Sequence, residues 1–510
     1  MHRLLLACLI LPVFVLFSCQ EEKHHSNRNL TLDAFSEMKT QFLAVNSQTI
    51  RKHLSKMTNQ DAGRMNADRR TRAYYQQKLP FLWIDRHGVD DRADSLVQYL
   101  EKVGETGIMP DMYRVSQIKD DLNRLRSLSL TEDNDVNRVM ARLEYNLTRA
   151  YFRYVSCQHF GYVNPTYTLN HYVKKDSDSI RTTYKFLYDV KTMRPDDNYF
   201  LMAYQKVNHD SVAPFLKEIQ PHGTFYNRLV NLLNSGKLSC QERLKVVSNI
   251  EKCRWQTEDS PEMHQKYVLV NIPSFRLYAY DEDSVLTMKV GCGKLDTRTP
   301  LIYSYIKRIE LNPQWIVPKS IAKTVVGKIG YLHRNNMFVV ERGVGKLPAE
   351  CASIEKVMSG KQYIVQAGGE GNSLGRIIFR FENNFSVYLH HTNTPWVFQR
   401  NSRAVSHGCV RVENPYELAV FLLKDKDEKL MDKIKYSMEV DLNSETDDGD
   451  GGRPAVDRSR MVSTVNIEPE IPVFICYYTC FPSSDGEMQY YDDVYGYDAA
   501  ILEEMRNFIQ

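Results

Sequence analysis

Apolar residues recur at helical spacing through the first half of the chain. Leu96, Leu100 and Val103 fall on one helical face. A second stripe of this kind consists of Met140, Leu143, Leu147, Ala150 and Tyr154. The stretch FGYVNP then ends that helix with a glycine and a proline. This region contains no cluster of catalytic residue types, so the pattern predicts a helical scaffold domain over residues 67–258.

The period changes at Lys266. KYVLVNIP, FRLYAYDED and SVLTMKVGCG are short β-rich segments with a polar hairpin turn, and NMFVVER, GRIIFRF and FSVYLHH follow them. These segments predict a mainly β domain over 266–441, with a helical excursion around VPKSIAKTVVGKIGYLHRNN. Residues 442–464 are acidic and Gly-rich and predict a linker. The strand-like EIPVFICYYTCF begins a segment, 465–510, that we expect to complete the preceding sheet, which makes the fold class α+β and multidomain.

The chain begins with an apolar run, Leu4 to Phe17, after a short basic start. That run is too short to span a membrane and has the length of a signal-peptide core. It ends in LFSC, which is similar to the cleavage site of bacterial lipoproteins and predicts a lipoprotein signal peptide over residues 1–19 with Cys19 lipidated. An ordinary secretory signal cleaved nearby is the alternative. Residues 20–66 are polar and charged, with some helical tendency, and predict a tether.

Composition and charge narrow the class of protein. With 43% hydrophobic and 25% charged residues, the chain can build globular cores. A net charge of +3 gives no reason to expect nucleic acid or an anionic membrane surface as a partner. Of the ten cysteines, Cys8 and Cys19 lie in the signal. We expect most of the other eight to be buried free thiols; Cys476 and Cys480 could pair, although an extended strand would hold them apart.

The candidate chemistry lies in SHGCVR, residues 406–411. A thiol is a poor nucleophile at neutral pH until a base removes its proton, and a histidine can do so within hydrogen-bond reach. His390 follows the β-rich SVYL, so a strand would hold it rigidly. Gly408 lets a short loop turn tightly before Cys409, and backbone N–H groups there could hold an oxyanion. This stretch therefore predicts a nucleophile loop.

Two other interpretations of these residues remain open at this point. The first is a zinc site formed by His390, His391, His407 and Cys409, although the one-residue gap between His407 and Cys409 is tighter than usual zinc spacing. The second is that Cys409 is simply buried and that the histidines are structural.

A longer stretch resembles a known family. YLHHTNTPWVFQRNSRAVSHGCVRVENPYELA is similar to the motif of the YkuD-type L,D-transpeptidases, cysteine enzymes of bacterial peptidoglycan, in which a histidine precedes Ser/Thr-His-Gly-Cys at this distance. Further segments resemble the large YcbB-like subfamily: VNIPSFRLYAY, MKVGCGKLDTRTP, LNPQWIVPKSIA, QAGGEGNSLGRIIFRF and the terminal IPVFICYYT. FLWIDRHGVDDRADSLVQYLEKVGETGIMPDMY resembles its helical scaffold. The resemblance covers most of the chain from about residue 74 onward and makes zinc a remote option.

The resemblance implies a role for each matching residue. Cys409 is similar to the nucleophile and His390 to the general base. His407 and Gly408 match residues that shape the pocket and oxyanion site, and Ser406 is their polar neighbour. Further positions complete the implied site: Arg411, which would bind a substrate carboxylate or brace the loop, Tyr388 and Trp315, which would line the cleft, and a capping insertion over about 320–375.

The family's activity implies a peptidoglycan L,D-transpeptidase that forms 3–3 crosslinks between tetrapeptide stems, with no metal or organic cofactor and with carbapenems as covalent inhibitors. The same acyl-enzyme could serve an L,D-carboxypeptidase or a D-amino-acid exchange enzyme, and a non-catalytic peptidoglycan-binding lipoprotein is a further alternative. The signal implies the cell envelope, with the protein lipid-anchored in the periplasm.

Three departures from the family pattern stand out. His391 occupies a position where a small or acidic residue is expected. FYNRLVNLLNSGKLSCQERLKVVSNIEKCRW leaves no room for a separate peptidoglycan-binding module. The lipid anchor is atypical for such an enzyme.

Overall fold

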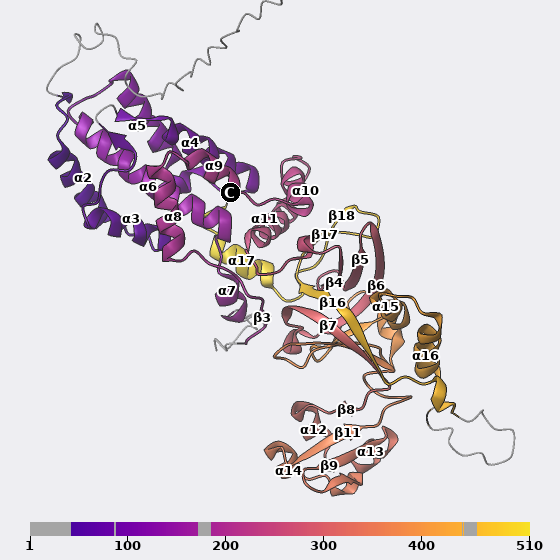
Figure 1. Cartoon of the computed structure of the whole chain (residues 1–510). Coiled ribbons are helices and arrows are strands. Elements are labelled where there is room, and N and C mark those ends of the chain that lie inside the picture. Colours follow the sequence, from indigo (N-terminus) through magenta and orange to yellow (C-terminus); the bar gives the residue numbers. More distant parts are fainter. Residues whose placement is uncertain (1–41, 86–87, 172–184, 441, 443–455, 510) are drawn as a thin grey trace, which may run out of the picture. The chain divides into compact units, whose positions relative to one another are not determined.

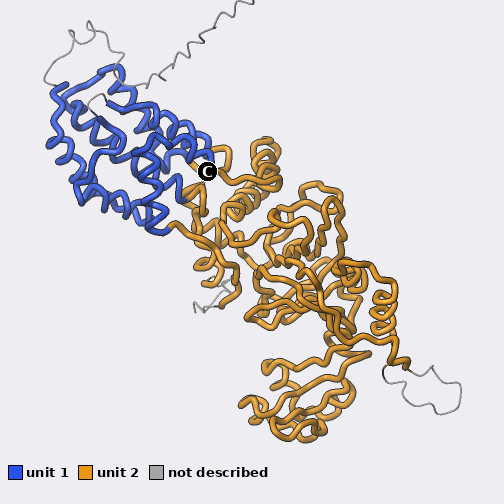
Figure 2. The backbone as a smooth tube through the Cα atoms, in the orientation of Figure 1, with its two compact units in different colours: residues 1–103, 110–156, 196–219 blue, residues 104–109, 157–195, 220–510 orange. Residues whose placement is uncertain are grey.

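The computed structural model describes residues 42–85, 88–171, 185–440, 442 and 456–509. Its backbone separates into two compact units (Figure 2). The first comprises 1–103, 110–156 and 196–219, and the second 104–109, 157–195 and 220–510. The predicted signal peptide with Cys19, residues 20–41 of the predicted tether and residues 443–455 of the predicted linker lie outside the described residues. In the part of the chain that the structure describes, no helix has the length and apolar character needed to cross a membrane.

The first unit is helical. Its elements are α2 (Ser47–Gln60), α3 (Asn66–Gln76), the short strands β1 (Ile84–Asp85) and β2 (Gly88–Val89), α4 (Asp91–Lys102), α5 (Val115–Ser127), α6 (Val136–Phe160, whose last four residues belong to the second unit), α8 (Asp197–Asn208) and α9 (Val212–Glu218). α6 is buried along most of its length, and its residues Val139, Leu143 and Leu147 are fully shielded from solvent. The helical scaffold predicted from periodicity is confirmed.

The predicted tether is wrong for its last part. α2 begins after Asn46, whose side chain accepts a hydrogen bond from the backbone N–H of Thr49 at 3.0 Å. Ile50 and Leu54, four residues apart, are only 2% and 3% exposed. A stripe this narrow is hard to separate from a polar segment by periodicity alone, and its burial against the unit makes it a helix.

Outside its sheets, the second unit contains several helices. They are α7 (Pro165–His171), α10 (Thr224–Leu233), α11 (Cys240–Arg254), α15 (Pro415–Leu422), α16 (Glu428–Glu439) and α17 (Tyr497–Met505). α11 begins with a capping box, in which Ser239 accepts from the N–H of Glu242 and the Glu242 carboxylate accepts from the N–H of Ser239. α10 and α11, which we expected in the scaffold, therefore cluster with the second unit.

The main sheet of the second unit closes on itself. Its strands are β3 (Tyr188–Asp189), β4 (Lys266–Asn271), β5 (Arg276–Asp281), β6 (Ser284–Gly293), β7 (Leu301–Leu311), β12 (Ile377–Phe381), β13 (Leu389–His390), β14 (Ala404–Ser406), β15 (Val410–Val412) and β16 (Thr464–Cys476). Of these, β4, β5, β6, β7 and β16 are labelled in Figure 1. The order runs β12-β13-β15-β6-β5-β4-β16-β7, and β12 pairs again with β7. β16 lies between β4, parallel to it, and β7, antiparallel to it. The C-terminal strand is thus internal to the sheet, and β17 (Cys480–Pro482) and β18 (Met488–Tyr490) form a separate hairpin after it.

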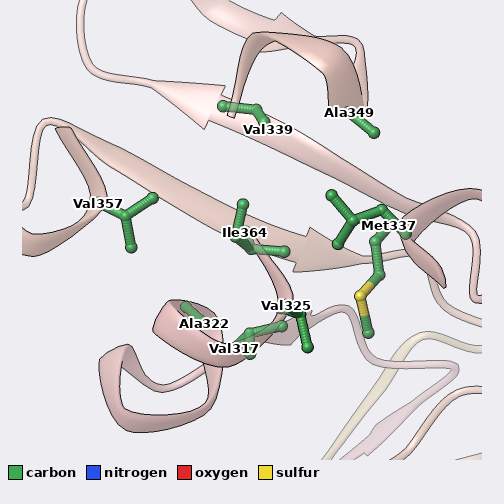
Figure 3. Close-up of a cluster of buried hydrophobic side chains, with 9 residues drawn as sticks. Val317, Ala322, Val325, Met337, Val339, Ala349, Val357 and Ile364 are labelled. Carbon is green, nitrogen blue, oxygen red and sulfur yellow. The ribbon is translucent and has the colours of Figure 1, made fainter. Parts of the chain in front are cut away.

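The insertion between β7 and β12 has its own core. It contains β8 (Trp315–Ile316), α12 (Lys319–Val325), α13 (Ile329–Arg334), β9 (Met337–Glu341), β10 (Gly345–Leu347), α14 (Ile354–Ser359) and β11 (Gln362–Gln366). The strands form a four-stranded antiparallel sheet. Ala322 of α12, Val339 of β9 and Ile364 of β11 meet in one buried cluster (Figure 3). The expected helical cap is therefore a mixed α/β module.

Candidate active site

β13 and β15 bring the predicted catalytic residues to one face of the sheet. They pair in parallel, with Leu389 opposite Val410 and His390 opposite Arg411. Leu389 and Val410 are both 0% exposed and point into the core. Because side chains alternate along a strand, His390 and Arg411 take the other face, and Cys409, one residue before Val410, takes it with them. The cysteine and the histidine thus lie on the same side of neighbouring strands.

The ring of His390 is oriented by two backbone carbonyls. Its Nδ1 donates to the carbonyl oxygen of His391 at 2.5 Å and to that of Leu374 at 3.3 Å. Because a carbonyl only accepts, the proton is on Nδ1 and the Nε2 lone pair can accept a proton. Burial, and secondarily the positive charge of Arg411, lower the pKa of His390 to about 4. His390 is therefore a neutral imidazole at neutral pH.

Cys409 is half-buried, and its Sγ lies 3.7 Å from the carbonyl oxygen of Ser386. Burial raises the pKa of the Cys409 thiol, against the opposing effects of the Tyr388 backbone N–H and the charges of Arg380 and Arg411. With the thiol pKa raised and the imidazole pKa lowered, both side chains are uncharged at neutral pH.

Ser406 closes the loop that carries the cysteine. Its Oγ donates to the carbonyl oxygen of Cys409 at 2.6 Å and accepts from the N–H of Gly408 at 3.1 Å. Gly408 has φ +123°, a conformation that side-chain-bearing residues rarely adopt. The Gly408 N–H is therefore occupied within the loop. The N–H of Cys409 donates to no acceptor in the described ranges and is the donor left to face a substrate.

The other two histidines have different surroundings. The Nδ1 of His391 accepts from the backbone N–H of Arg376 at 3.2 Å, which turns this ring toward the start of β12. The side chain of His407 is exposed, and burial followed by the charges of Lys294 and Arg411 lowers its pKa. Among residues 42–85, 88–171, 185–440, 442 and 456–509, no three His, Cys, Asp or Glu side chains gather as metal ligands.

Arg411 is a half-buried cation with spare hydrogen-bonding capacity. Its Nη1 donates to Oγ1 of Thr394 at 3.0 Å. Its Nε is buried and has no acceptor among the residues described. One donor of this side chain therefore braces the neighbouring Thr394, and another is left available for a ligand such as a carboxylate.

A cleft of about 870 Å³ lies next to the nucleophile loop: Cys409 does not line it, but Ser386, whose carbonyl oxygen is 3.7 Å from the Cys409 sulfur, does. Ser386 and Tyr388 line it, and the Arg380 guanidinium lies 4.3 Å from the centre of the Tyr388 ring. Trp315 is not brought into this group, because it packs against the core of the inserted α/β module. Arg380 was not expected from the sequence, since nothing in GRIIFRF marks one arginine as facing a cleft.

Comparison with known proteins assigns both regions. Residues 265–434 match the family model for the L,D-transpeptidase catalytic domain, YkuD, and residues 68–233 match the Scaffold domain. The chain carries a YkuD-type L,D-transpeptidase catalytic domain after a Scaffold domain. The matched range contains all of the loop and strand residues described above, Trp315 included.

One curated relative is the Haemophilus influenzae protein named "Putative L,D-transpeptidase", 25% identical over 320 residues. The match covers 61% of this chain and 60% of the relative, so the chain spans less than two thirds of that protein's length. A solved structure, the Ldtfm–avibactam carbamoyl enzyme, is similar at 14% identity and a TM-score of 0.19, covering 35% of this chain and 58% of the other. That likeness is too remote to support an inference about the site.

Proposed function

We propose that the protein is a peptidoglycan L,D-transpeptidase that forms 3–3 crosslinks through an acyl-enzyme on Cys409. The observation that carries the proposal is the register of β13 and β15, in which His390 lies opposite Arg411, two residues after Cys409, with its Nδ1 bound to backbone carbonyls so that Nε2 is left to accept a proton. The L,D-transpeptidase family match supports the class of reaction.

In the first half-reaction, the Cys409 sulfur attacks the carbonyl between the L- and D-centres of a tetrapeptide stem. The thiol proton passes to His390 Nε2 and then to the departing amine, so the C–N bond breaks and the terminal D-amino acid leaves. In the second half, an amine of a neighbouring stem attacks the thioester and gives its proton to His390. The new amide forms and the thiol is restored.

Arg411 is proposed to hold a carboxylate of the stem. Its buried Nε without an acceptor and its position across from His390 support this role. Tyr388 and the cleft beside it would take the rest of the peptide.

The same acyl-enzyme supports two other outcomes, since water would give an L,D-carboxypeptidase and a free D-amino acid an exchange enzyme. To separate them, purified protein is incubated with a disaccharide tetrapeptide and the products are followed by mass spectrometry. Crosslinked dimer with released D-amino acid is the expected result. Tripeptide alone indicates carboxypeptidation and a swapped terminal residue indicates exchange, whereas unchanged tetrapeptide would refute catalysis and leave a peptidoglycan-binding lipoprotein.

We also propose that Cys19 is lipidated and holds the enzyme in the periplasm. The apolar run before LFSC supports a signal peptide of the lipoprotein kind. Cys19→Ala should move the protein from the membrane fraction to the soluble one. An unchanged distribution would refute the anchor and leave the catalytic proposal untouched.

A further inference from the structure

The carbonyl oxygen of Gly408 accepts a hydrogen bond from a residue outside the nucleophile loop. Thr299 Oγ1 donates to it at 2.8 Å, across 109 residues of sequence. Thr299 is 0% exposed and lies between β6 and β7, outside the SHGC motif. The loop is therefore held by a side chain that the motif does not contain.

Further hydrogen bonds hold the side chain and the backbone of Thr299 in place. Its Oγ1 accepts from the N–H of Gly293 at 2.8 Å, and its own N–H donates to the Tyr495 hydroxyl at 3.1 Å. The Tyr495 hydroxyl donates in turn to the carbonyl oxygen of Gly293 at 2.6 Å. A Cβ on Gly293 would lie 2.0 Å from the carbonyl oxygen of Thr297, so only glycine allows this close approach. Each hydroxyl both donates and accepts, which leaves the Thr299 side chain one orientation.

The direction of the Gly408 carbonyl determines the direction of the next N–H. A trans peptide is planar, and its C=O and N–H point to opposite sides. Because the Gly408 carbonyl points to buried Thr299, the N–H of Cys409 points away from the interior, on the side of the half-buried sulfur. The Gly408 N–H is already bound to Ser406.

We propose that Thr299, oriented by Tyr495, is a positioning residue that turns the Gly408–Cys409 peptide so that the Cys409 N–H is the oxyanion donor. The inference rests on the proposed acyl transfer at Cys409. In the tetrahedral intermediate the former carbonyl oxygen carries the negative charge, and a donor aimed at that atom in advance stabilises it.

Tyr495 extends this role to the C-terminal segment. The matched catalytic domain ends at residue 434, and Tyr495 lies after β18, just before α17. It is 0% exposed, and its N–H donates to the Tyr477 hydroxyl at 2.7 Å. The segment after the matched domain therefore supplies part of the support for the nucleophile loop.

The test compares two reactions of the same sulfur. Ring opening by a carbapenem forms a C–S bond at the lactam carbonyl and breaks the C–N bond through an oxyanion. Alkylation by iodoacetamide displaces iodide from carbon and forms no oxyanion. Mass spectrometry of the Cys409 peptide follows both rates, which separates this thiol from the exposed Cys240 and Cys351.

Thr299→Val removes the donor to the Gly408 carbonyl while keeping the shape of the side chain. We expect carbapenem acylation to fall about a hundredfold, the effect typical of losing an oxyanion donor, with alkylation of Cys409 within about twofold of wild type. Thr299→Ser keeps the hydroxyl and should restore most of the acylation rate. Tyr495→Phe, which releases Thr299 only in part, should lower acylation about tenfold.

Thr479→Val is the matched control, because Thr479 is also 0% exposed and bonds Asn249 and Asp498 instead of the loop. It should lower thermal stability and leave the ratio of the two rates unchanged. Equal losses of acylation and alkylation in Thr299→Val, or no loss in either, would overturn the positioning role. If wild-type protein is alkylated but never acylated by carbapenem or stem peptide, the proposed function fails instead.

Discussion

The helical unit and the nucleophile region differ in whether their buried polar groups have hydrogen-bond partners. In the helical unit the buried carboxylate of Glu144 accepts from three successive backbone N–H groups and one hydroxyl, those of Leu82, Trp83, Ile84 and Tyr75. Asp68, 0% exposed, accepts from Arg153 at 2.6 and 2.9 Å and lies 3.3 Å from Arg149. Around Cys409, by contrast, the Nε of Arg411 and the N–H of Cys409 have no acceptor in the described chain.

The difference separates polar groups that stabilise the fold from polar groups that are left to bind a substrate. A buried charge surrounded by partners stabilises one arrangement of the chain, and removing a partner is costly. A buried donor without a partner costs stability unless a ligand supplies the acceptor, so its presence beside a cleft marks where a substrate is expected.

The largest expected effect comes from the nucleophile. Cys409→Ser should abolish both the carbapenem adduct and turnover of the disaccharide tetrapeptide, because a hydroxyl is far harder than a thiol for the same imidazole to deprotonate. Intact mass and product analysis measure both. Thermal stability should stay within about 0.5 kcal/mol of wild type, since serine has nearly the shape of cysteine and the side chain is only half-buried. An adduct that persists, or that maps to Cys292 or Cys351, would contradict the assignment.

The same substitution at two arginines tests the comparison directly. Arg153→Met should lower the free energy of unfolding by about 3 kcal/mol, at the lower end for a broken buried pair because Arg149 still contacts Asp68. Arg411→Met should leave that free energy within about 1 kcal/mol of wild type or raise it, because it removes a buried donor that lacks an acceptor. Its kcat/KM for the tetrapeptide should fall at least about tenfold.

Chemical denaturation gives the two stabilities, and steady-state kinetics at fixed folded concentration gives the activity. If Arg411→Met proves as destabilising as Arg153→Met while the activity of its folded fraction is unchanged, Arg411 is a brace and the contrast between the two regions is lost.

A smaller effect is expected from pH. The acylation rate should be flat from about pH 8 down to about pH 5 and fall only as pH approaches 4, because burial keeps His390 neutral well below its usual pKa of 6.5. Rapid-mixing kinetics with a carbapenem measures this profile. His390→Ala should cut the plateau about a hundredfold and remove the acid limb. An acid limb between about 4 and 6.5 would assign the base to another imidazole, such as the exposed His407, whose pKa is also lowered.

Stability follows from the same pKa. His390 is neutral in both folded and unfolded chains above pH 6.5 and contributes no pH dependence there. Between 6.5 and about 4 the unfolded chain takes up a proton that the folded chain does not, so the folded state loses stability as pH falls. His390→Ala should lessen that loss.

Local patterns in the sequence predicted the architecture and supplied the candidate catalytic pair. The helical period before residue 258 and the short β-rich segments after Lys266 are read within ten or twenty residues, and both are reflected in the Scaffold and YkuD matches. The sequence pointed to Cys409 and His390 because both lie in the one stretch that resembles the L,D-transpeptidase motif. The inserted module was expected to be helical because β9 and β11 become a sheet only by pairing with each other, across 20 or more residues.

What local patterns missed depends on distant contacts. Thr299 and Gly408 are 109 residues apart, and no feature of DTRTP marks its second threonine as a support for a loop. Trp315 was expected in the cleft from its resemblance to family members, and its packing against the inserted module could not be read from four residues of sequence. The division into units, each assembled from separate stretches of chain, is likewise set by tertiary packing.

The internal position of β16 has a consequence for when the enzyme can work. β4 and β7 pair with β16 and not with each other, and β16 begins only at Thr464. A chain that has left the ribosome or an export channel only as far as the SHGC loop contains the proposed nucleophile and base. It still lacks β16, the strand that lies between β4 and β7 and closes the sheet. Activity is therefore expected to appear late, when almost the whole chain is on the same side of the membrane as its substrate, and a recombinant protein cut at residue 434 would expose two unpaired strand edges.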